Sequence, residues 1–288
     1  MQILRNLPSG TPGARRLIDG EISIELSPDQ AREFKPGPDV FKPGSRVFLT
    51  HLEGKSLGLQ RDAAKRLLGM GYVPVPHLGA RNFESAEDFV QHISSHSANG
   101  VRESLFLGGN PGSAPGPFSE AADLLSHPVL ADLGIRSAFL GGYPEGHPAI
   151  PAEKLAAATA RKLDICTSRS LEPHIVSQFA FDGDAVAAWA SELSARWPSV
   201  RIRIGLAGVT SLTKLIKFAA MCGIGPSMAV LKRSGVGLLN VLADKNPSDV
   251  IEAIQTKMVG QSTALDLHFF PFGGWQKTLA WVAAYRNG

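Results

Sequence analysis

The chain repeats one pattern along most of its length: a short, nearly continuous apolar run is followed by a segment with helical spacing. Such runs are typical of parallel strands buried on both faces, with the helices as crossovers between them. The predicted strands are residues 21–28, 46–52, 72–78, 104–109, 137–142, 174–179, 200–206 and 265–270. The predicted helices are residues 57–70, 85–97, 119–125, 151–163, 184–197, 212–221 and 275–285, and a long, mostly helical insertion precedes the last strand.

About eight strands, each followed by a helix or by a loop that could hold one, predict an α/β fold with a single (β/α)8 TIM barrel. Residues 1–20 are rich in Pro, Gly and Arg and are predicted to form an N-terminal arm or a cover over the barrel bottom, and residues 21–288 form the catalytic barrel. A doubly wound open sheet is the alternative that the pattern leaves open. That alternative lacks its main support, because no GxGxxG motif follows the first strand and there is no P-loop.

Composition and charge limit the classes of function. With 44% hydrophobic residues, 19% charged residues and no long uncharged apolar run, the chain is expected to be a soluble protein without a membrane segment. The N-terminus lacks the apolar region of a secretory signal, and the spacing of Cys166 and Cys222 suits neither a disulfide scaffold nor a zinc site. We therefore expect a cytoplasmic protein without a metal. The net charge of +3 comes from scattered Lys and Arg residues, which favours small anionic ligands over nucleic acid.

Polar side chains gather where the predicted strands end, which is the edge of a TIM barrel that carries the active site. The set contains Glu25, Thr50, His51, His77, Asn110, Tyr143, Glu145, His147, Gln178 and His268.

Glu25 is the most informative member of this set. In an alternating strand Ile22, Ile24 and Leu26 share one face, so Glu25 points into the barrel with small hydroxyl side chains near it. A carboxyl group among apolar neighbours has a raised pKa and can serve as a general acid. A structural carboxylate bonded to backbone amides or to an Arg fits the alternation equally well.

Four other positions have a functional and a structural interpretation. The loop 143–148 follows two glycines and contains two prolines, so it displays Tyr143 and His147 rigidly, although a plain surface turn has the same composition. The Gln178 amide could bind a planar heterocycle such as a pterin or a nicotinamide, or it could form a structural hydrogen bond to a neighbouring strand. His77 could hold a phosphate, but a bond to a backbone carbonyl is the commoner role of a single His. Arg161 and Lys162 could reach a diphosphate, although a solvated pair near a helix C-terminus is the default.

The aromatic run 269–272, together with Trp275, also has two interpretations. It could form a homo-oligomer interface, or it could pack the last strand against its own helix, which we favour.

Taken together, these segments resemble the methylenetetrahydrofolate reductase family from about residue 21 to the last strand. The resemblance is carried by Ile24-Glu25-Leu26-Ser27-Pro28, by the Tyr143-Pro144-Glu145-Gly146-His147-Pro148 loop, by Gln178 in a Gln-Phe-x-Phe-Asp run, by Arg161-Lys162-Leu163-Asp164 and by the turn at 205–211. It implies a (β/α)8 barrel that interconverts 5,10-methylenetetrahydrofolate and 5-methyltetrahydrofolate with NAD(P)H. In the family FAD is commonly bound and passes the hydride.

The resemblance also implies roles for single residues. Glu25 would supply the proton to the folate and Gln178 would bind the folate. The flavin contacts would be Thr50, His77, Tyr143 and His147, with Gly109 at the end of the fourth strand and with Arg161 and Lys162 in the cofactor site.

Two departures from the family pattern concern the flavin. The family's Leu-Arg-Gly-Asp motif reads Leu107-Gly108-Gly109-Asn110 here, and the helix before Arg161 is rich in alanine at 155–160. Each lost charged or hydrogen-bonding partner costs about 1 to 3 kcal/mol, which predicts weak FAD binding. The Asn110 amide still suits a pterin. The hydride could pass through a weakly held FAD or directly from the nicotinamide to the folate, and we favour the direct route.

Two other classes of function stay open. One is a non-catalytic barrel that binds a folate or a nucleotide, because a fold does not imply the family's chemistry. The other is an unrelated barrel lyase or hydrolase that uses Glu25 and His147 as acid and base.

Overall fold

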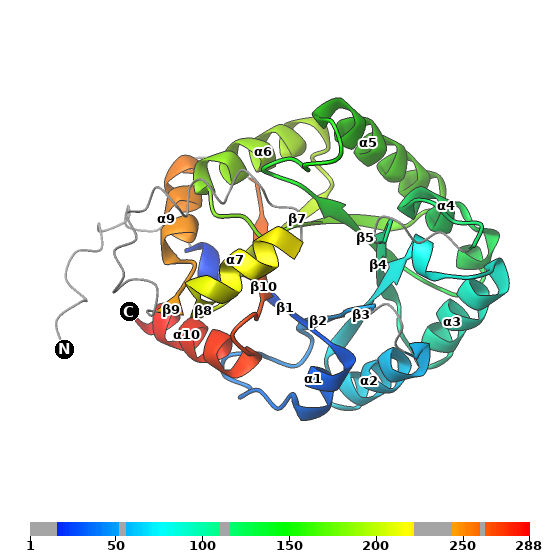
Figure 1. Ribbon diagram of the computed structural model, residues 1–288, viewed down its shortest axis with the longest axis horizontal. Coiled ribbons are helices and arrows are strands. Elements are labelled where there is room, and N and C mark those ends of the chain that lie inside the picture. The colour runs from blue at the N-terminus through cyan, green and yellow to red at the C-terminus, as the bar shows by residue number, and fades with distance from the viewer. Residues whose placement is uncertain (1–15, 52–55, 110–115, 222–243, 260–262) are drawn as a thin grey trace.

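Eight parallel strands close into a barrel with helices around the outside, as predicted (Figure 1). The computed structural model describes residues 16–51, 56–109, 116–221, 244–259 and 263–288. Around the barrel the strands are β1 (Ile22–Leu26), β2 (Arg46–Leu49), β3 (Val73–Gly79), β4 (Glu103–Leu107), β5 (Ser137–Gly142), β6 (Glu172–Ser177), β7 (Arg201–Ala207) and β10 (Leu265–Phe270). Strand β10 pairs in parallel with β1, which closes the barrel and excludes the open sheet.

The outer layer consists of helices that surround the barrel (Figure 1). They are α1 (Pro28–Glu33), α2 (Leu57–Gly69), α3 (Ala86–Ala98), α4 (Ala121–Ser126), α5 (Ala152–Ser168), α6 (Gly183–Arg196), α9 (Ser248–Lys257) and α10 (Trp275–Asn287). Helix α7 (Leu212–Met221) lies inside this ring beside β7 and β10, where Leu215 packs in a cluster with Ala207 and Phe270. The short strands β8 (Thr210–Ser211) and β9 (Asp244–Lys245) pair with each other outside the barrel. Residues 222–243 and 260–262 of the predicted insertion lie outside the described part, and α9 is the helix described between them.

Helix α1 was not predicted, because Pro28 was interpreted only as the end of a strand. The side chain of Ser27 accepts a hydrogen bond from Gln30 N, and the Gln30 side chain accepts one from Ser27 N. This is a capping box with proline at the first helical position, where proline is favoured because its missing N–H needs no partner there. The spacing of Ser27, Pro28 and Gln30 was the signal for this helix.

Strand β3 contains Pro74 and Pro76 and still forms part of the closed barrel. Its Val73 N–H donates to Ser45 O on the β2 side. Successive N–H groups of a parallel strand point to opposite neighbours, so the N–H groups that Pro74 and Pro76 lack would have pointed to β4. The pairing of β3 with β4 begins only at His77. The two missing donors therefore leave the β2–β3 ladder intact up to His77.

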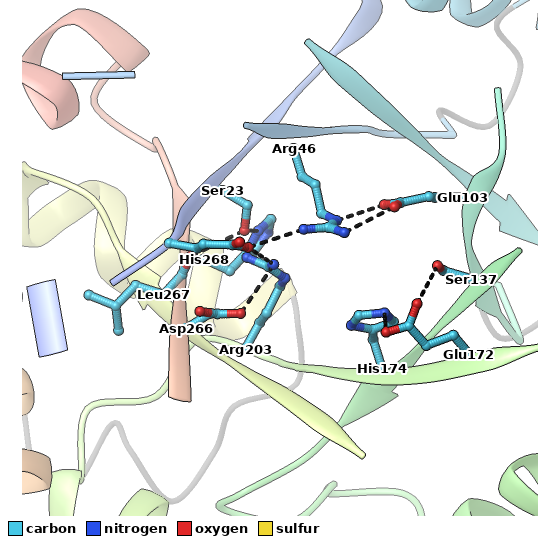
Figure 2. Close-up of polar contacts among 11 residues, drawn as sticks. Ser23, Arg46, Glu103, Ser137, Glu172, His174, Arg203, Asp266, Leu267 and His268 are labelled. Atoms are coloured by element: carbon cyan, nitrogen blue, oxygen red, sulfur yellow. Dashed lines mark hydrogen bonds and ion pairs between the residues drawn. The ribbon is translucent and has the colours of Figure 1, made fainter. Parts of the chain in front are cut away.

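A charged network fills the bottom of the barrel, where the strands begin (Figure 2). Arg46 donates to both oxygens of Glu103, at 2.7 and 3.0 Å, and its third nitrogen lies 3.1 Å from Glu21. The buried Arg203 lies 2.8 Å from Glu21 and 3.2 Å from Asp266. Burial alone would raise the pKa of Glu21, but the hydrogen bond and charge of Arg203, with the charge of Arg46, outweigh it and lower that pKa.

One aromatic layer separates this network from the mouth of the barrel. Phe48 and Phe139 are fully buried and meet edge to face, with ring centroids 5.0 Å apart. Phe139 stacks on His174 below, and Phe48 meets His268, at 4.5 Å in each case. The interior is thus a packed core with charges at one end.

The first described residues meet the last helix of the chain. Arg16 donates to Tyr285 O, and Arg286 donates to Ile18 O and Val40 O. Ile18 is fully buried. Residues 16–19 therefore pack against α10 beside the start of β1, while residues 1–15 lie outside the described part, so the predicted arm stays a prediction.

The aromatic residues at 269–272, which begin inside β10, and Trp275 pack against other parts of the chain. Phe269 is buried and contacts Trp281, Phe272 stacks on Phe218 at 4.1 Å, and Trp275 meets Phe34 at 5.1 Å. These contacts fit the favoured interpretation of the run. Within the described residues, no helix is both long and apolar enough to cross a membrane.

Replacing Arg203 by Met should destabilise the fold. The substitution leaves the partly buried Asp266 without its cation, and breaking a buried pair costs about 3 to 5 kcal/mol of unfolding free energy. Denaturant unfolding measures the loss, with Arg32→Met, an exposed arginine on α1 that pairs with Asp29, as the control. Equal stability of the two variants would contradict a supporting role for the network.

Candidate functional site

Strand β1 presents Glu25 to the barrel interior, as the alternation predicts. Ile22, Ile24 and Leu26 are buried on the other face, beneath the helices. Ser23 is fully buried, and the Glu25 side chain is 21% exposed, close to the mouth. Glu25 therefore lies between the packed interior and the open end of the barrel.

The described partners of the Glu25 carboxyl are two imidazoles. Its Oε2 lies 3.4 Å from Nε2 of His77 on β3 and 3.9 Å from Nε2 of His268 on β10. Burial raises the pKa of Glu25, and the opposing attraction of His77 is smaller. Burial also lowers the pKa of His77 to about 4 and that of His268 to about 3. Both rings are thus neutral near pH 7, so neither forms an ion pair with the carboxyl, and burial favours the protonated form of Glu25.

Gln60 of α2, which the sequence reasoning did not include, fixes the strand ends around this carboxyl. Its amide nitrogen donates to Leu49 O at 2.9 Å, to His77 O at 3.1 Å and to Thr50 O at 3.3 Å. Its oxygen faces Nε2 of His92 at 2.8 Å and Nε2 of His96 at 3.2 Å. A polar residue on the buried stripe of a predicted helix was the available signal. The ends of β2 and β3 are consequently held in register with each other.

Thr50 follows β2 at the mouth. Its N–H donates to Leu26 O, whereas its buried hydroxyl oxygen makes no hydrogen bond within the described residues. A buried polar atom of this kind costs free energy unless a ligand or a water satisfies it. The Thr50 hydroxyl is therefore available to a bound molecule.

The loop after β5 holds Tyr143 and His147 against each other, with ring centroids 5.4 Å apart and planes nearly perpendicular. Gly146 has φ +78°, a conformation that suits glycine, and His147 Nδ1 accepts a hydrogen bond from Ala149 N. Glu145 Oε1 accepts hydrogen bonds from Phe181 N at 3.0 Å and Asp182 N at 2.9 Å. The carboxylate thus ties this loop to the loop that follows β6.

Gln178 lies at the start of that second loop. Its N–H donates to Gly142 O at 2.8 Å, and its side-chain oxygen accepts a hydrogen bond from Phe179 N at 3.0 Å. These contacts extend the pairing of β5 with β6 beyond the strands. Gln178 and the Tyr143 loop therefore occupy neighbouring positions on the rim.

At the end of β4 an arginine from another segment of the chain contacts the backbone. Gly109 has φ +87°, and its carbonyl accepts a hydrogen bond from Arg81 Nη1 at 2.9 Å. A Cβ on Gly108 would lie 3.4 Å from the same Arg81 nitrogen. Arg81 thus brings a guanidinium to this part of the rim, which the sequence reasoning did not foresee. Asn110 lies outside the described residues.

Arg161 and Lys162 lie on α5, in the outer helical layer. Arg161 forms an ion pair with Glu120, the residue that precedes α4. Burial lowers the pKa of Lys162. Within the described contacts, neither side chain meets Glu25, Gln178 or the loop at 143–148. Their predicted role in binding a diphosphate stays a prediction.

An aromatic wall borders the mouth beside β10 and α7, and the sequence reasoning did not include it in the site. His268 meets the Phe270 ring at 4.8 Å and almost at a right angle. Phe179 packs against Phe270 at 5.5 Å and against Phe272 at 4.8 Å, and Leu215 of α7 joins the same cluster. Such a wall supplies an apolar surface for a flat ring. Across the residues described here, no group of three or more His, Cys, Asp or Glu side chains is arranged to hold a metal ion.

A comparison with known protein families finds no match to this sequence. Among solved structures, the chain is similar to an uncharacterized protein from Clostridium thermocellum that binds two copies of 5-methyl-5,6,7,8-tetrahydrofolic acid, with a TM-score of 0.62 and 11% identity over 93% of this chain and 95% of that chain. It is also similar to a proposed phosphonomutase from Burkholderia cenocepacia, with a TM-score of 0.51 and 12% identity over 95% of this chain and 96% of that chain. At these identities the likeness shows a shared barrel fold.

Replacing Glu25 by Gln should make stability less sensitive to alkali. An unfolded glutamate has a pKa of about 4.3, and the folded value is higher, so the folded state binds the proton more tightly. The wild type therefore loses unfolding free energy as the pH rises from about 4.3 through the folded pKa, by about 1.4 kcal/mol for each unit of pKa difference. Gln stays neutral throughout and avoids this loss.

The free energy of unfolding is measured at about pH 4 and about pH 8 for both proteins. The value for Glu25→Gln minus the value for the wild type should be larger at the higher pH. Glu87→Gln, on the exposed face of α3, is the control and should show no such growth. An advantage that is constant with pH would contradict the raised pKa.

Proposed function

We propose that this chain is a methylenetetrahydrofolate reductase-type oxidoreductase that interconverts 5,10-methylenetetrahydrofolate and 5-methyltetrahydrofolate with NAD(P)H or NAD(P)+. The observation that carries the proposal is Glu25, a carboxyl with a raised pKa at the barrel mouth whose described partners are two neutral imidazoles. A neutral acid at this position suits the proton transfer that reduction of the methylene group requires. The shared fold with a protein that binds 5-methyltetrahydrofolic acid supports a folate as the ligand.

In the proposed reaction Glu25 donates its proton to the folate nitrogen that leaves the methylene carbon. The carbon–nitrogen bond breaks with its electron pair on that nitrogen, and an iminium forms with the other one. The nicotinamide then gives a hydride to the iminium carbon, which becomes the methyl group, and NAD(P)H becomes NAD(P)+. The reverse sequence oxidises 5-methyltetrahydrofolate.

The other predicted site residues have binding roles in this proposal. Gln178 and Asn110 bind the pterin through their amides. Thr50, His77, Gly109, Tyr143 and His147 line the part of the rim that receives the nicotinamide nucleotide. The unsatisfied Thr50 hydroxyl and the rigid contact of Tyr143 with His147 support their part in it.

The described residues fit a tightly bound FAD poorly. Arg161, which would hold its diphosphate, already pairs with Glu120, and burial lowers the pKa of Lys162. A phosphate would have to displace the carboxylate of Glu120. We therefore propose direct hydride transfer from the nicotinamide to the folate.

Glu25→Gln should lower turnover by about 10² to 10⁴, the usual contribution of a positioned general acid, while folate binding is retained. NAD(P)H oxidation with 5,10-methylenetetrahydrofolate measures turnover, and calorimetric titration measures binding. Glu87→Gln should behave as wild type in both assays. Full activity of Glu25→Gln would overturn the assignment of the acid.

Direct transfer predicts a purified protein that lacks stoichiometric flavin absorbance and whose activity does not respond to added FAD. The visible spectrum and the assay with and without FAD test this. A protein that contains one flavin per chain, or that turns over only with FAD, would show that the hydride passes through the flavin.

A second candidate is a barrel that binds a folate without acting on it, and the folate-binding neighbour is the observation that favours it. The two candidates differ in a single experiment. The binding protein would bind 5-methyltetrahydrofolate but show no NAD(P)H oxidation with the methylene compound. A lyase or hydrolase that pairs Glu25 with His147 has less support, because the described contacts of His147 are with Tyr143 and Ala149.

A further inference from the structure

Ser23 and His268 form a buried pair directly below Glu25. They are register partners on β1 and β10, and the two side chains are 0% and 1% exposed. Ser23 Oγ lies 3.0 Å from His268 Nδ1 and 3.2 Å from Leu267 O (Figure 2). The sequence alternation placed a hydroxyl near Glu25, and the barrel closure gives that hydroxyl an imidazole partner.

The donors and acceptors in this pair determine which nitrogen of His268 carries the proton. A carbonyl oxygen only accepts, so the single Ser23 hydroxyl proton goes to Leu267 O. Both contacts are then satisfied only when His268 Nδ1 carries a proton and donates it to Ser23 Oγ. In a neutral ring this leaves Nε2 as an acceptor, and Nε2 is the atom that faces Glu25.

We propose that Ser23 and His268 are positioning residues that favour the protonated form of Glu25. Ser23 holds His268 in the Nδ1–H tautomer, so that the lone pair on Nε2 faces the carboxyl and accepts its proton in a hydrogen bond. The inference rests on the proposed role of Glu25 as the acid. It adds the two residues that set the protonation state of this acid.

The groups around the pair support a neutral arrangement. Phe48 and Phe270 meet the His268 ring edge to face, at 4.5 and 4.8 Å, and bury it. Burial, together with the positive charge of Arg203 on β7, disfavours a proton on both nitrogens of His268. His77 faces Glu25 from β3 and is also neutral near pH 7, while Phe48 is the register neighbour of Glu25 on β2. A charged Glu25 would face the His268 lone pair, which would disfavour the carboxylate further.

The distances indicate how the hydrogen bond forms. Glu25 Oε2 is 3.9 Å from His268 Nε2 and 3.4 Å from His77 Nε2, and the first of these exceeds a normal hydrogen bond. Catalytic hydrogen bonds are often long without substrate and shorten when it binds.

Ser23→Ala tests the proposal. NMR of isotope-labelled histidine should show His268 with its proton on Nδ1 in the wild type and a mixture of tautomers in the variant. Infrared difference spectra should show the acid carbonyl band of Glu25, identified by its loss in Glu25→Gln, disappearing at lower pH in Ser23→Ala than in the wild type. Ser104→Ala removes another fully buried hydroxyl, one without a hydrogen-bond partner in the part of the chain that the structure describes, and is the control that should leave both spectra unchanged.

Kinetics supply a readout that a merely structural role would not change. Turnover should fall at high pH as Glu25 ionises, and in Ser23→Ala this fall should begin about one pH unit lower. At pH values above the Glu25 pKa the variant should therefore have a kcat about tenfold lower than the wild type, with little change in KM. A structural defect would lower kcat by the same factor at every pH.

A second pair of variants keeps the test decisive if Ser23→Ala fails to fold. His268→Gln places an amide oxygen near the position of Nε2, whereas His268→Asn retains only the group near Nδ1. The Gln variant should keep the acid band of Glu25 closer to wild type than the Asn variant does. His268 with its proton on Nε2, or an unshifted Glu25 band in Ser23→Ala, would overturn the proposal. If the protein has no reductase activity, the two spectroscopic tests still decide this inference separately from the proposed function.

Discussion

Closure of the barrel forces a set of side chains into one narrow interior, and the neighbours of each carboxyl group there determine its charge. At the bottom Glu21 is bonded to Arg46 and Arg203, and its pKa is lowered. At the mouth, beyond the layer of Phe48 and Phe139, Glu25 meets only imidazoles among its described partners, and its pKa is raised. The pKa is thus lowered for the carboxyl just before β1 and raised for the carboxyl near the end of β1.

The rim of the barrel depends on side chains that tie neighbouring strand ends together. Gln60 bonds the ends of β2 and β3, Glu145 bonds the loops after β5 and β6, and Arg81 bonds the end of β4. Each tie fixes a segment that bears a predicted ligand contact, which lowers the ordering cost of binding. Side chains outside the predicted contacts therefore hold these segments of the rim in place.

Much of the architecture could be predicted from the sequence because local patterns encode it. Apolar runs and helical spacing predicted the eight-stranded barrel, which the structure confirms, and the alternation around Glu25 correctly placed its side chain inside. Element ends were less accurate: β2 ends at Leu49 rather than at residue 52, and α5 runs on to Ser168. The sequence contains the helix-capping residues Ser27 and Gln30, but Pro28 was interpreted only as the end of a strand, so α1 was not predicted.

The partners of the predicted residues could not be predicted, because they depend on closure between distant segments. His268 reaches Ser23 only because β10 pairs with β1, and Arg81 reaches Gly109 from the loop after β3. No local pattern connects such positions. For the same reason the sequence left open whether Glu25 meets an arginine or an apolar surrounding, and the structure answers with two neutral imidazoles.

The most direct test of the account follows the hydride itself. The protein is incubated with 5,10-methylenetetrahydrofolate and with NADH or NADPH that carries deuterium at both C4 positions of the nicotinamide, and the product is analysed by mass spectrometry. Direct transfer predicts 5-methyltetrahydrofolate that retains the deuterium in its methyl group. A methyl group that contains solvent hydrogen instead, or the absence of this product, would contradict the account.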